Sequence, residues 1–246
     1  MLTAILTDIH ANREALTACL AHAAHAGARR YVFLGDYVGY GADPAFVLDL
    51  VMRFVQQGAV AVLGNHDQAA IIGARGMSEA AQAAIEWTRP RLNDAHRNFL
   101  SGLPLTIEDA DRLFVHAGAV HPERWDYVIG RKSAADSLLA ASRHATFCGH
   151  VHVPALYHLS NTGKVGELIP TTSVGIPLLP RRRWLAVIGA VGQPRDRNPA
   201  ACYGLLDEDT DVLTYLRVPY DTATAARKIR EAGLPPSLGL RLESGY

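Results

Sequence analysis

The chain has 246 residues, of which 49% are hydrophobic and 20% are charged, and this composition is typical of a folded globular protein. Its 24 basic residues are balanced by 24 acidic residues, so it lacks the basic excess of a nonspecific nucleic-acid binder, and we expect no stable nucleic-acid binding. No run approaches the roughly 20 apolar residues that a membrane span needs, so we expect no membrane association.

The length fits one α/β domain, and no linker or shift in composition divides the chain, so we predict a single domain over residues 1–246. The N-terminus enters a strand pattern directly, without the basic region and apolar core of a signal peptide, which predicts a cytoplasmic protein. The three cysteines, Cys19, Cys148 and Cys202, are widely separated and form neither a disulfide framework nor a CxxC zinc site.

The first part of the chain alternates short apolar runs with helical patterns. It predicts a strand over residues 2–7, a helix over 12–25, a strand over 31–34, a helix over 45–57 and a strand over 59–63. Successive strand–helix units imply a parallel sheet with right-handed crossovers. In such sheets the functional groups collect at the carboxyl ends of the strands.

The middle of the chain is dominated by an alanine-rich, amphipathic helical pattern over residues 69–103, with a break at Pro90. We expect this segment to cover one side of a site. Beyond it the sequence predicts strands over 113–115 and 145–148, with a helix over 133–141 between them.

From residue 155 onward, short strand patterns follow one another with few helices between them, which favours antiparallel pairing. The predicted elements are strands over residues 155–159, 165–169, 184–188, 202–207 and 212–218, and a helix over 222–232. We therefore predict an α/β (α+β) fold, a four-layer α-β-β-α sandwich in which two mixed sheets pack face to face between flanking helices.

Five polar motifs each follow a predicted strand. They are Asp8-Ile9-His10, Gly35-Asp36, Gly64-Asn65-His66-Asp67, His116-Ala117-Gly118 and Gly149-His150-Val151-His152. Phosphate ester hydrolysis needs a nucleophile that is strong at neutral pH and a counter-charge for the phosphoryl group, and two metal ions about 3.5–4 Å apart supply both. The motifs offer enough donors for such a pair if Asp36 bridges: Asp8, His10, Asp36, Asn65, His116, His150 and His152. Mixed imidazole, carboxylate and carboxamide donors suit Mn, Fe, Zn or Co better than Ca or Mg.

This order of motifs resembles the calcineurin-like metallophosphoesterase superfamily, and Tyr40-Gly41-Ala42-Asp43-Pro44 resembles its small bacterial phosphodiesterase or diadenosine-tetraphosphatase-like branch. The resemblance implies two divalent or trivalent metal ions, with manganese expected and Fe, Zn, Co or Ni as alternatives. It places one ion on Asp8, His10, Asp36 and His152. It places the other on Asp36, Asn65, His116 and His150.

The resemblance also implies that a hydroxide bridging the two metals attacks phosphorus in line. His66 is then not a ligand but contacts a phosphoryl oxygen or protonates the leaving group, oriented by Asp67, which is general acid catalysis. Asn65 would contact the substrate as well as a metal. Asp67 could equally cap the following helix, because its carboxylate can accept backbone N–H groups at a helix start.

One departure from the superfamily narrows the substrate. Its protein Ser/Thr phosphatases carry Asp-Arg-Gly shortly after the Gly-Asp motif, whereas Tyr37-Val38-Gly39 follows Asp36 here, without the phosphate-binding arginine. We therefore expect hydrolysis of small phosphodiesters or nucleotide-type phosphoanhydrides, with a small phosphorylated substrate as the partner. Phosphomonoesterase or protein phosphatase activity is the enzymatic alternative.

Two other hypotheses come from outside this reaction class. Some relatives keep this fold as a catalytically weak protein-binding scaffold, but His66 together with a full ligand set weighs against that role here. A mononuclear metal-binding regulator would hold one metal per chain. The sequence leaves open whether the protein forms a homo-oligomer.

A late glycine-proline loop, Val191-Gly192-Gln193-Pro194-Arg195-Asp196, resembles the Gly-Ser-Val-Gly-Gln-Pro-Arg loop near the active site of bacterial phosphodiesterase-like members, with Ala190 where serine is usual. Arg195 is a candidate for binding a second phosphate or a leaving group, because a guanidinium suits phosphate oxygens. An ordinary turn held by an Arg–Asp pair is an equal alternative. Arg181-Arg182-Arg183 is most simply a solvated turn.

Overall fold

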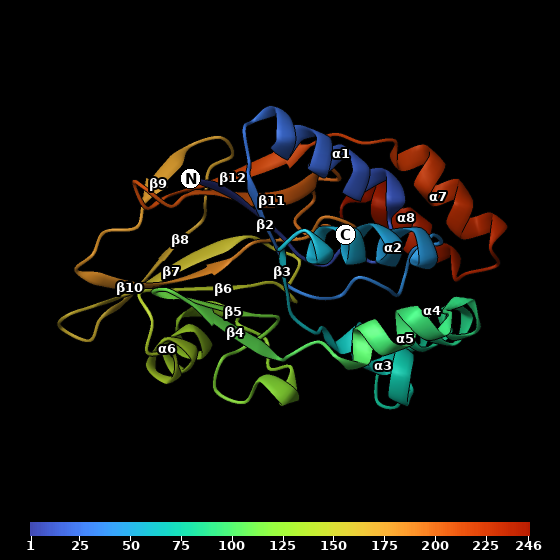
Figure 1. The fold of residues 1–246 in the computed structure, drawn as a ribbon, viewed down its shortest axis with the longest axis horizontal. Coiled ribbons are helices and arrows are strands. Elements are labelled where there is room, and N and C mark those ends of the chain that lie inside the picture. The colour runs from blue at the N-terminus through green and yellow to red at the C-terminus, as the bar shows by residue number, and fades with distance from the viewer.

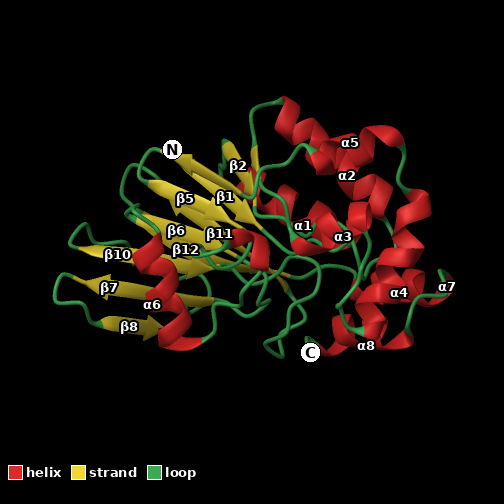
Figure 2. Ribbon diagram, turned by 90° about the horizontal axis from the view of Figure 1, so that it is seen from below, coloured by secondary structure: helices red, strands yellow, loops and turns green.

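Two six-stranded mixed sheets pack face to face, with helices on their outer faces (Figures 1 and 2). The computed structural model describes all residues 1–246. Figure 1 shows one helix, α6 (Gly130–Ala140), apart from the others on the outer side of one sheet, while the remaining helices gather around the other sheet and at one end of the sandwich. The predicted four-layer α-β-β-α sandwich is therefore confirmed.

The first sheet combines a parallel half and an antiparallel half. Its strands, in spatial order, are β3 (Val60–Ala61), β2 (Arg30–Phe33), β1 (Leu2–Leu6), β11 (Ala201–Asp207), β12 (Val212–Val218) and β9 (Gly175–Pro177). The strands β1, β2 and β3 are parallel, as the strand–helix alternation predicts, and β11, β12 and β9 continue the sheet in antiparallel pairs. The sheet therefore joins the two ends of the chain.

The second sheet is also mixed. Its strands, in spatial order, are β4 (Thr106–Asp109), β5 (Arg112–Val115), β6 (Ala145–Cys148), β10 (Arg182–Val187), β7 (Ala155–Ser160) and β8 (Val165–Leu168). The central strands β5, β6 and β10 are parallel, and the outer strands pair antiparallel. The carboxyl ends of β5 and β6 therefore lie at the same edge of the sheet.

Seven further helices complete the fold. They are α1 (Arg13–His25), α2 (Pro44–Gln56), α3 (Asn65–Ile72), α4 (Glu79–Thr88), α5 (Asp94–Ser101), α7 (Thr222–Glu231) and α8 (Pro236–Ser244), with 3-10 turns at Arg89–Arg91 and Pro122–Arg124. The helix α1 begins where the Asn12 side chain accepts a hydrogen bond from the Ala15 N–H at 3.0 Å, an N-cap that satisfies one free donor of the first turn. No helix has the length and apolar character needed to cross a membrane.

Alternation along the strands divides the core into layers. Ile5 and Phe147 point into the space between the sheets, where the Phe147 and Phe114 rings stack with centroids 5.6 Å apart. Their chain neighbours Leu6 and Cys148 point to the opposite faces and pack against helices. Because successive side chains of a strand face opposite sides, each sheet is buried on both faces. The motifs at the strand ends are therefore attached to a continuously packed apolar core.

The structure differs from the sequence-based expectations at several elements. The strand predicted over residues 59–63 contains only Val60–Ala61, because the Leu63 N–H donates to the Pro104 carbonyl at 2.8 Å instead of to β2. The helical segment 69–103 is three helices, α3, α4 and α5. The prediction of a turn at Arg181-Arg182-Arg183 is wrong for its last two residues, which open β10. The short strands β4 and β9 and the C-terminal helix α8 were not predicted.

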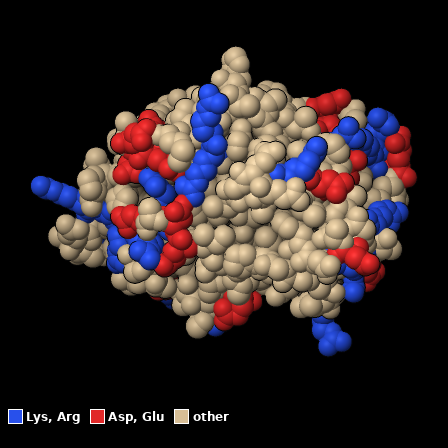
Figure 3. Space-filling view, in the orientation of Figure 1, with Lys and Arg blue, Asp and Glu red and all other residues tan.

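On the face drawn in Figure 3, basic and acidic side chains are interspersed and gather toward the two ends, with a broad uncharged area between them. This face therefore carries no continuous basic surface, in keeping with the balanced charge of the sequence.

Candidate metal centre

The polar motifs that follow β1, β2, β3, β5 and β6 meet at one edge of the sandwich. Two groups of side chains there have their ligand atoms within 4.8 Å of one another. The first group is Asp8, His10, Asp36 and His152. The second group is Asp36, His116 and His150. The carboxyl ends of strands from both sheets thus bring together residues that lie up to 144 positions apart in the chain, counted from Asp8 to His152 (152 − 8).

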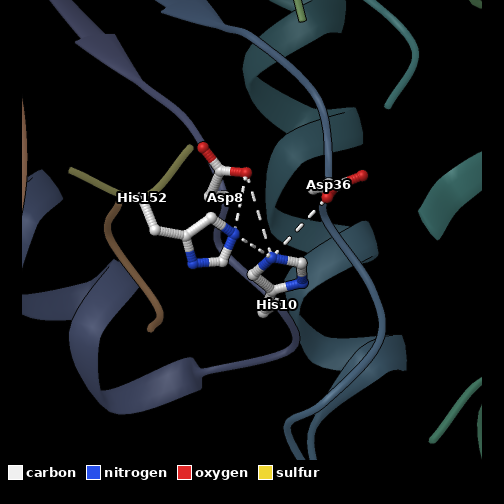
Figure 4. A group of neighbouring side chains, drawn as sticks. All are labelled: Asp8, His10, Asp36 and His152. Carbon is white, nitrogen blue, oxygen red and sulfur yellow. Dashed lines mark hydrogen bonds and ion pairs between the residues drawn. The ribbon is translucent and has the colours of Figure 1, made fainter. Parts of the chain in front are cut away.

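The first group is almost fully excluded from solvent, with exposed fractions of 0% for Asp8, 1% for His10, 1% for Asp36 and 2% for His152. Figure 4 shows the two imidazole rings turned toward each other between the carboxylates. The Nε2 atoms of His10 and His152 are 3.1 Å apart, and His152 Nε2 lies 3.3 Å from Asp8 Oδ1. His10 Nε2 lies 3.6 Å from Asp36 Oδ2. Four donors therefore surround one point.

The second group shares an oxygen with the first. The Oδ2 atom of Asp36, which faces His10, also lies 3.4 Å from Nε2 of His116. His116 Nε2 is in addition 3.2 Å from Oδ1 of Asn65, the first residue of α3. The His150 ring lies beside His116, with centroids 5.0 Å apart. Asp36 therefore stands between two donor sets, where a bridging carboxylate would be needed.

Backbone carbonyls fix which nitrogen of three histidines faces the centre. The Nδ1 atom of His10 lies 3.1 Å from the Val38 carbonyl, that of His116 lies 2.7 Å from the Leu34 carbonyl, and that of His152 lies 2.6 Å from the Gln193 carbonyl. A carbonyl can only accept, so each Nδ1 carries the proton and each Nε2 presents a lone pair in the neutral ring. This arrangement is the usual one for histidines that bind metals.

Several buried atoms at the centre lack the partners that buried polar atoms normally have. The lone pairs of His10 and His152 face each other, which is unfavourable unless a cation lies between them. Asp8 Oδ1 and His150 Nε2 are buried without any hydrogen-bond partner. The other oxygen of Asp8, Oδ2, accepts from Thr7 Oγ1 and from the His150 N–H, both at 2.9 Å. The residues present therefore fit metal ions.

The backbone of the proposed ligands is strained. Asp8, His10, Asp36, His150 and His152 have φ angles of 52°, 50°, 54°, 67° and 64°, in the left-handed region that non-glycine residues rarely occupy. Each such residue costs on the order of 1–3 kcal/mol and persists only where the surrounding structure enforces it. The fold thus holds these side chains in positions that the local sequence would not choose.

Two glycines let the backbone approach the carboxylates closely. A Cβ atom on Gly64 would collide with the backbone nitrogen and Oδ1 of Asp36, and one on Gly149 would collide with Thr7 and with Oδ2 of Asp8. Any side chain at these positions would displace a proposed ligand. The glycines of the third and fifth motifs are therefore part of the geometry of the centre.

The buried carboxylate of Asp67 serves the backbone around the centre. It accepts hydrogen bonds from the N–H groups of Asp36, Tyr37, Val38 and Gly64, at 2.7, 2.9, 3.2 and 3.1 Å. The bond to Gly64 spans the first turn of α3, so the helix-capping interpretation is confirmed. The expectation that Asp67 orients His66 is wrong, because no hydrogen bond joins the two side chains and His66 Nδ1 has no partner. Asp67 instead holds the loop that carries Asp36.

His66 itself lies next to the first group of ligands. Its side chain is buried, and its ring packs 4.5 Å from the Tyr40 ring and 4.8 Å from the His10 ring, centroid to centroid. The His66 N–H of the backbone donates to Asp36 Oδ1 at 2.8 Å, so the histidine and the shared carboxylate are positioned together. The imidazole is thus within reach of a group bound at the centre without belonging to either set of ligands.

A cleft of about 420 Å³ opens over the centre. It is lined by Asp36, Tyr40, Asn65, His66, Gly76, Met77, Ser78, Ala81, Trp125, Tyr127, His150, His152, Arg195 and Arg241. The residues between α3 and α4 contribute one wall, as expected for the segment 69–103. Arg195 also lines the cleft and donates to Gln193 Oε1 at 2.9 Å. The alternative of an Arg–Asp turn is wrong, because Asp196 pairs with Arg217.

Comparison with known proteins agrees with this geometry. A model of the calcineurin-like phosphoesterase superfamily domain matches residues 1–211. The chain belongs to this superfamily. It is 33% identical to an uncharacterised protein of Methanocaldococcus jannaschii, in an alignment that covers 98% of this chain and 97% of the relative.

Two solved structures are similar over their whole length. A metallophosphoesterase from Sphaerobacter thermophilus is 34% identical, with a TM-score of 0.88 and full coverage of both chains. A hypothetical protein from Pyrococcus horikoshii shares the fold at 19% identity, with a TM-score of 0.77, over 100% of this chain and 98% of that one.

Burial and neighbouring charges in this calcineurin-like centre lower the pKa of His66 and raise the pKa values of His116 and Asp67. Burial lowers the pKa of His66 to about 4, against the attraction of Asp36, so its imidazole is neutral at neutral pH. Burial also lowers the pKa of His116, but the charge and hydrogen bond of Asp36 outweigh it and raise the pKa to about 9. Burial and the charge of Asp36 raise the pKa of Asp67 to about 7, although its backbone N–H donors favour the ionised form.

Sequence reasoning missed several residues of the cleft, among them Tyr40, Tyr127 and Arg241. Tyr40 lies in a segment whose pattern indicates only a likeness to a branch of the superfamily, although its ring packs against both His10 and His66. Tyr127 stacks on His150 with ring centroids 4.1 Å apart, and it follows a turn without a recognisable motif. Arg241 lies on α8, in a C-terminal stretch without a clear helical pattern. None of the three has a local pattern that marks it.

Proposed function

We propose that this calcineurin-like protein is a dinuclear metal-dependent phosphoesterase that hydrolyses small phosphodiesters or nucleotide-type phosphoanhydrides. The observation that carries the proposal is the position of Asp36 Oδ2, which lies 3.6 Å from His10 Nε2 and 3.4 Å from His116 Nε2. One carboxylate oxygen facing two separate donor sets suits a bridging ligand of two neighbouring metal ions.

The donors divide between two ions without conflict. Asp8, His10, Asp36 and His152 would hold one ion, and Asp36, Asn65, His116 and His150 would hold the other. When bound, such a pair activates water as a nucleophile and neutralises charge on the phosphoryl group. The mixture of imidazole, carboxylate and carboxamide favours manganese, with Fe, Zn, Co or Ni as alternatives.

The chain's own residues would position the phosphoryl group. His66 is neutral at neutral pH, so it would donate an N–H hydrogen bond to a phosphoryl oxygen, and it would need to gain a proton before protonating a leaving group. Asn65 offers its amide N–H₂ to the same group while its oxygen faces His116. The cleft of about 420 Å³ suits a small-molecule substrate.

The test combines metal analysis with turnover. Elemental analysis of the wild-type protein, loaded with Mn²⁺ and dialysed, should give about two metals per chain, with hydrolysis of bis-p-nitrophenyl phosphate. Asp36→Asn should lose metal from both sites, because the shared oxygen contributes to each. Asp136→Asn, in the exposed part of α6, is the matched control and should keep both metals and activity.

Other outcomes assign other functions. Faster hydrolysis of p-nitrophenyl phosphate than of the diester would make the protein a phosphomonoesterase. Two metals without turnover of any phosphate ester would favour a protein-binding scaffold. One metal per chain under all loading conditions would contradict the dinuclear centre.

A further inference from the structure

The cleft over the metal centre carries two cationic side chains beyond the proposed ligands. Arg195 enters it from the loop that follows β10, and Arg241 enters it from α8. Asp36 is the only acidic residue that lines the cleft, and it belongs to the metal centre. The guanidinium groups therefore have no carboxylate within the cleft to neutralise them.

Arg241 differs from the other basic residues of the two C-terminal helices. Arg227, Lys228 and Arg230 of α7 each pair with a carboxylate. Arg241 is the basic residue of α8, and its half-buried side chain makes no hydrogen bond or ion pair. A partly buried guanidinium without a partner carries unused donors, which a bound anion would satisfy.

Arg195 is held in place by a neutral group. Its Nε and Nη2 atoms donate to the Gln193 side-chain oxygen at 3.3 and 2.9 Å, so its charge stays uncompensated. Its guanidinium carbon lies 5.6 Å from the Tyr40 ring centre, and that ring packs 4.5 Å from the ring of His66. Arg241 lines the same cleft, so two cationic side chains lie beside the proposed metal centre.

We propose that Arg195 and Arg241 form a second anion subsite, and that the substrate carries a second phosphate next to the one that is hydrolysed. This inference rests on the proposed function. The two metals and His66 already meet the charge of one phosphoryl group, and a simple diester offers no further negative charge. Two additional guanidinium groups match the next phosphate of a phosphoanhydride, because their planar donors suit phosphate oxygens.

Two aromatic side chains in the lining of the cleft would accept a flat organic group. Tyr127 is 52% exposed, and its ring stacks on His150 at 4.1 Å with an interplanar angle of 21°. Trp125 stands beside it in the lining. The cleft of about 420 Å³ lies within the range of about 300–1,000 Å³ that is typical of small-molecule and cofactor sites. The substrate class is therefore a nucleoside polyphosphate, with its base against the aromatic wall.

The first test measures binding and does not depend on turnover. Methylenediphosphonate and methylphosphonate are titrated into dialysed, Mn-loaded protein by calorimetry, with metal content checked afterwards. The wild type should bind the diphosphonate more tightly by roughly 10–100-fold, the range expected for one or two charge-assisted hydrogen bonds. Arg241→Gln and Arg195→Gln should each remove most of this preference, and the surface variant Arg227→Gln should retain it.

A structural role for Arg241 predicts a different result. A cation in the last turn of α8 also complements the helix dipole, so Arg241→Gln could lower the melting temperature alone. A lower melting temperature with an unchanged diphosphonate preference would overturn the proposal, as would a wild type that binds both phosphonates equally.

The second test uses the substrate. Arg241→Gln should lower kcat/KM for a dinucleoside polyphosphate about tenfold more than for bis-p-nitrophenyl phosphate, mainly through KM. Equal losses on both compounds would contradict a role in binding a second phosphate. A wild-type protein that hydrolyses neither compound would contradict the proposed function, while the phosphonate titration would still decide whether the subsite exists.

Discussion

The apolar layer between the sheets and the metal centre at its edge have opposite effects on stability, although only a few residues separate them in the chain. Phe147 is fully buried in regular strand β6 and stacks on Phe114. His150 and His152, just beyond the end of that strand, have left-handed backbone, and Nε2 of His150 is a buried atom without a partner. The core gains stability from each contact, whereas the centre holds groups that are costly without a cation.

This difference indicates how the protein divides its tasks. The sandwich provides the rigidity, and the loops at the carboxyl ends of the strands hold the reactive groups in unfavourable positions. Variants of the two regions should therefore fail in different ways. A core variant should lose stability and keep its chemistry once folded, and a variant of the centre should lose its chemistry and keep its fold.

The largest effect is expected for His66→Ala. Turnover should fall by about 10²–10⁴-fold, because the imidazole that we propose to contact the phosphoryl or leaving group is removed. The metal content should remain that of the wild type, since His66 belongs to neither donor set. Steady-state kinetics with elemental analysis measures both, and the exposed His25→Ala is the control. Loss of metal in His66→Ala would contradict the assignment.

Phe147→Ala tests the second region of the comparison, the apolar layer between the sheets. Removing a fully buried ring from between the sheets should lower the free energy of unfolding by about 3–5 kcal/mol. Urea denaturation measures this loss, and Leu139→Ala on the exposed side of α6 should change it by less than about 0.5 kcal/mol. The folded fraction of Phe147→Ala should still bind metal with wild-type stoichiometry; a centre that is lost in folded protein would show that the two regions are not separable.

Asp67→Asn tests the residue that holds the backbone around the metal centre in place. The carboxylate accepts four backbone N–H groups, and an amide retains one acceptor oxygen while turning an N–H₂ toward the other donors. We expect a loss of about 1.5–3 kcal/mol in the free energy of unfolding, measured by denaturant titration of the metal-free protein. If Asp67 acted only by orienting His66, turnover would fall with no change in stability.

The smallest expected effect is the release of one proton when metal binds. In the metal-free protein the pKa of His116 is about 9, so at pH 7.5 its ring is protonated, and it must lose that proton to bind a metal. Metal affinity should therefore fall as the pH drops below 9, and binding at pH 7.5 should release about one proton from this residue. Calorimetry in two buffers of different ionisation enthalpy measures the release. An equal release in His116→Asn would contradict the assignment to this group.

The sequence was sufficient to predict the four-layer sandwich and the meeting of five motifs, because each motif is attached to an apolar strand whose direction the parallel topology fixes. Asp8, Asp36 and His150 therefore lie at one edge, as expected. The role of Asp67 could not be predicted, since three of its donors lie about 30 positions away, at Asp36 to Val38.

The elements that were missed have weak local signals. The strand β9 has three residues and ends in Pro177, and β4 carries two acidic residues in four. The helix α8 begins at the second of two consecutive prolines and contains a glycine, so its helical pattern is poor, yet it packs on α7 and brings Arg241 to the cleft. Tertiary contacts, and not local propensity, determine the secondary structure of these segments.

The most direct test of the dinuclear centre is electron paramagnetic resonance of the protein loaded with two equivalents of Mn²⁺. Two ions that share Asp36 should be magnetically coupled, giving a multiline dinuclear signal, which Asp36→Asn should abolish. A signal from isolated Mn²⁺ alone, in wild-type protein that has bound its metal, would contradict the central claim.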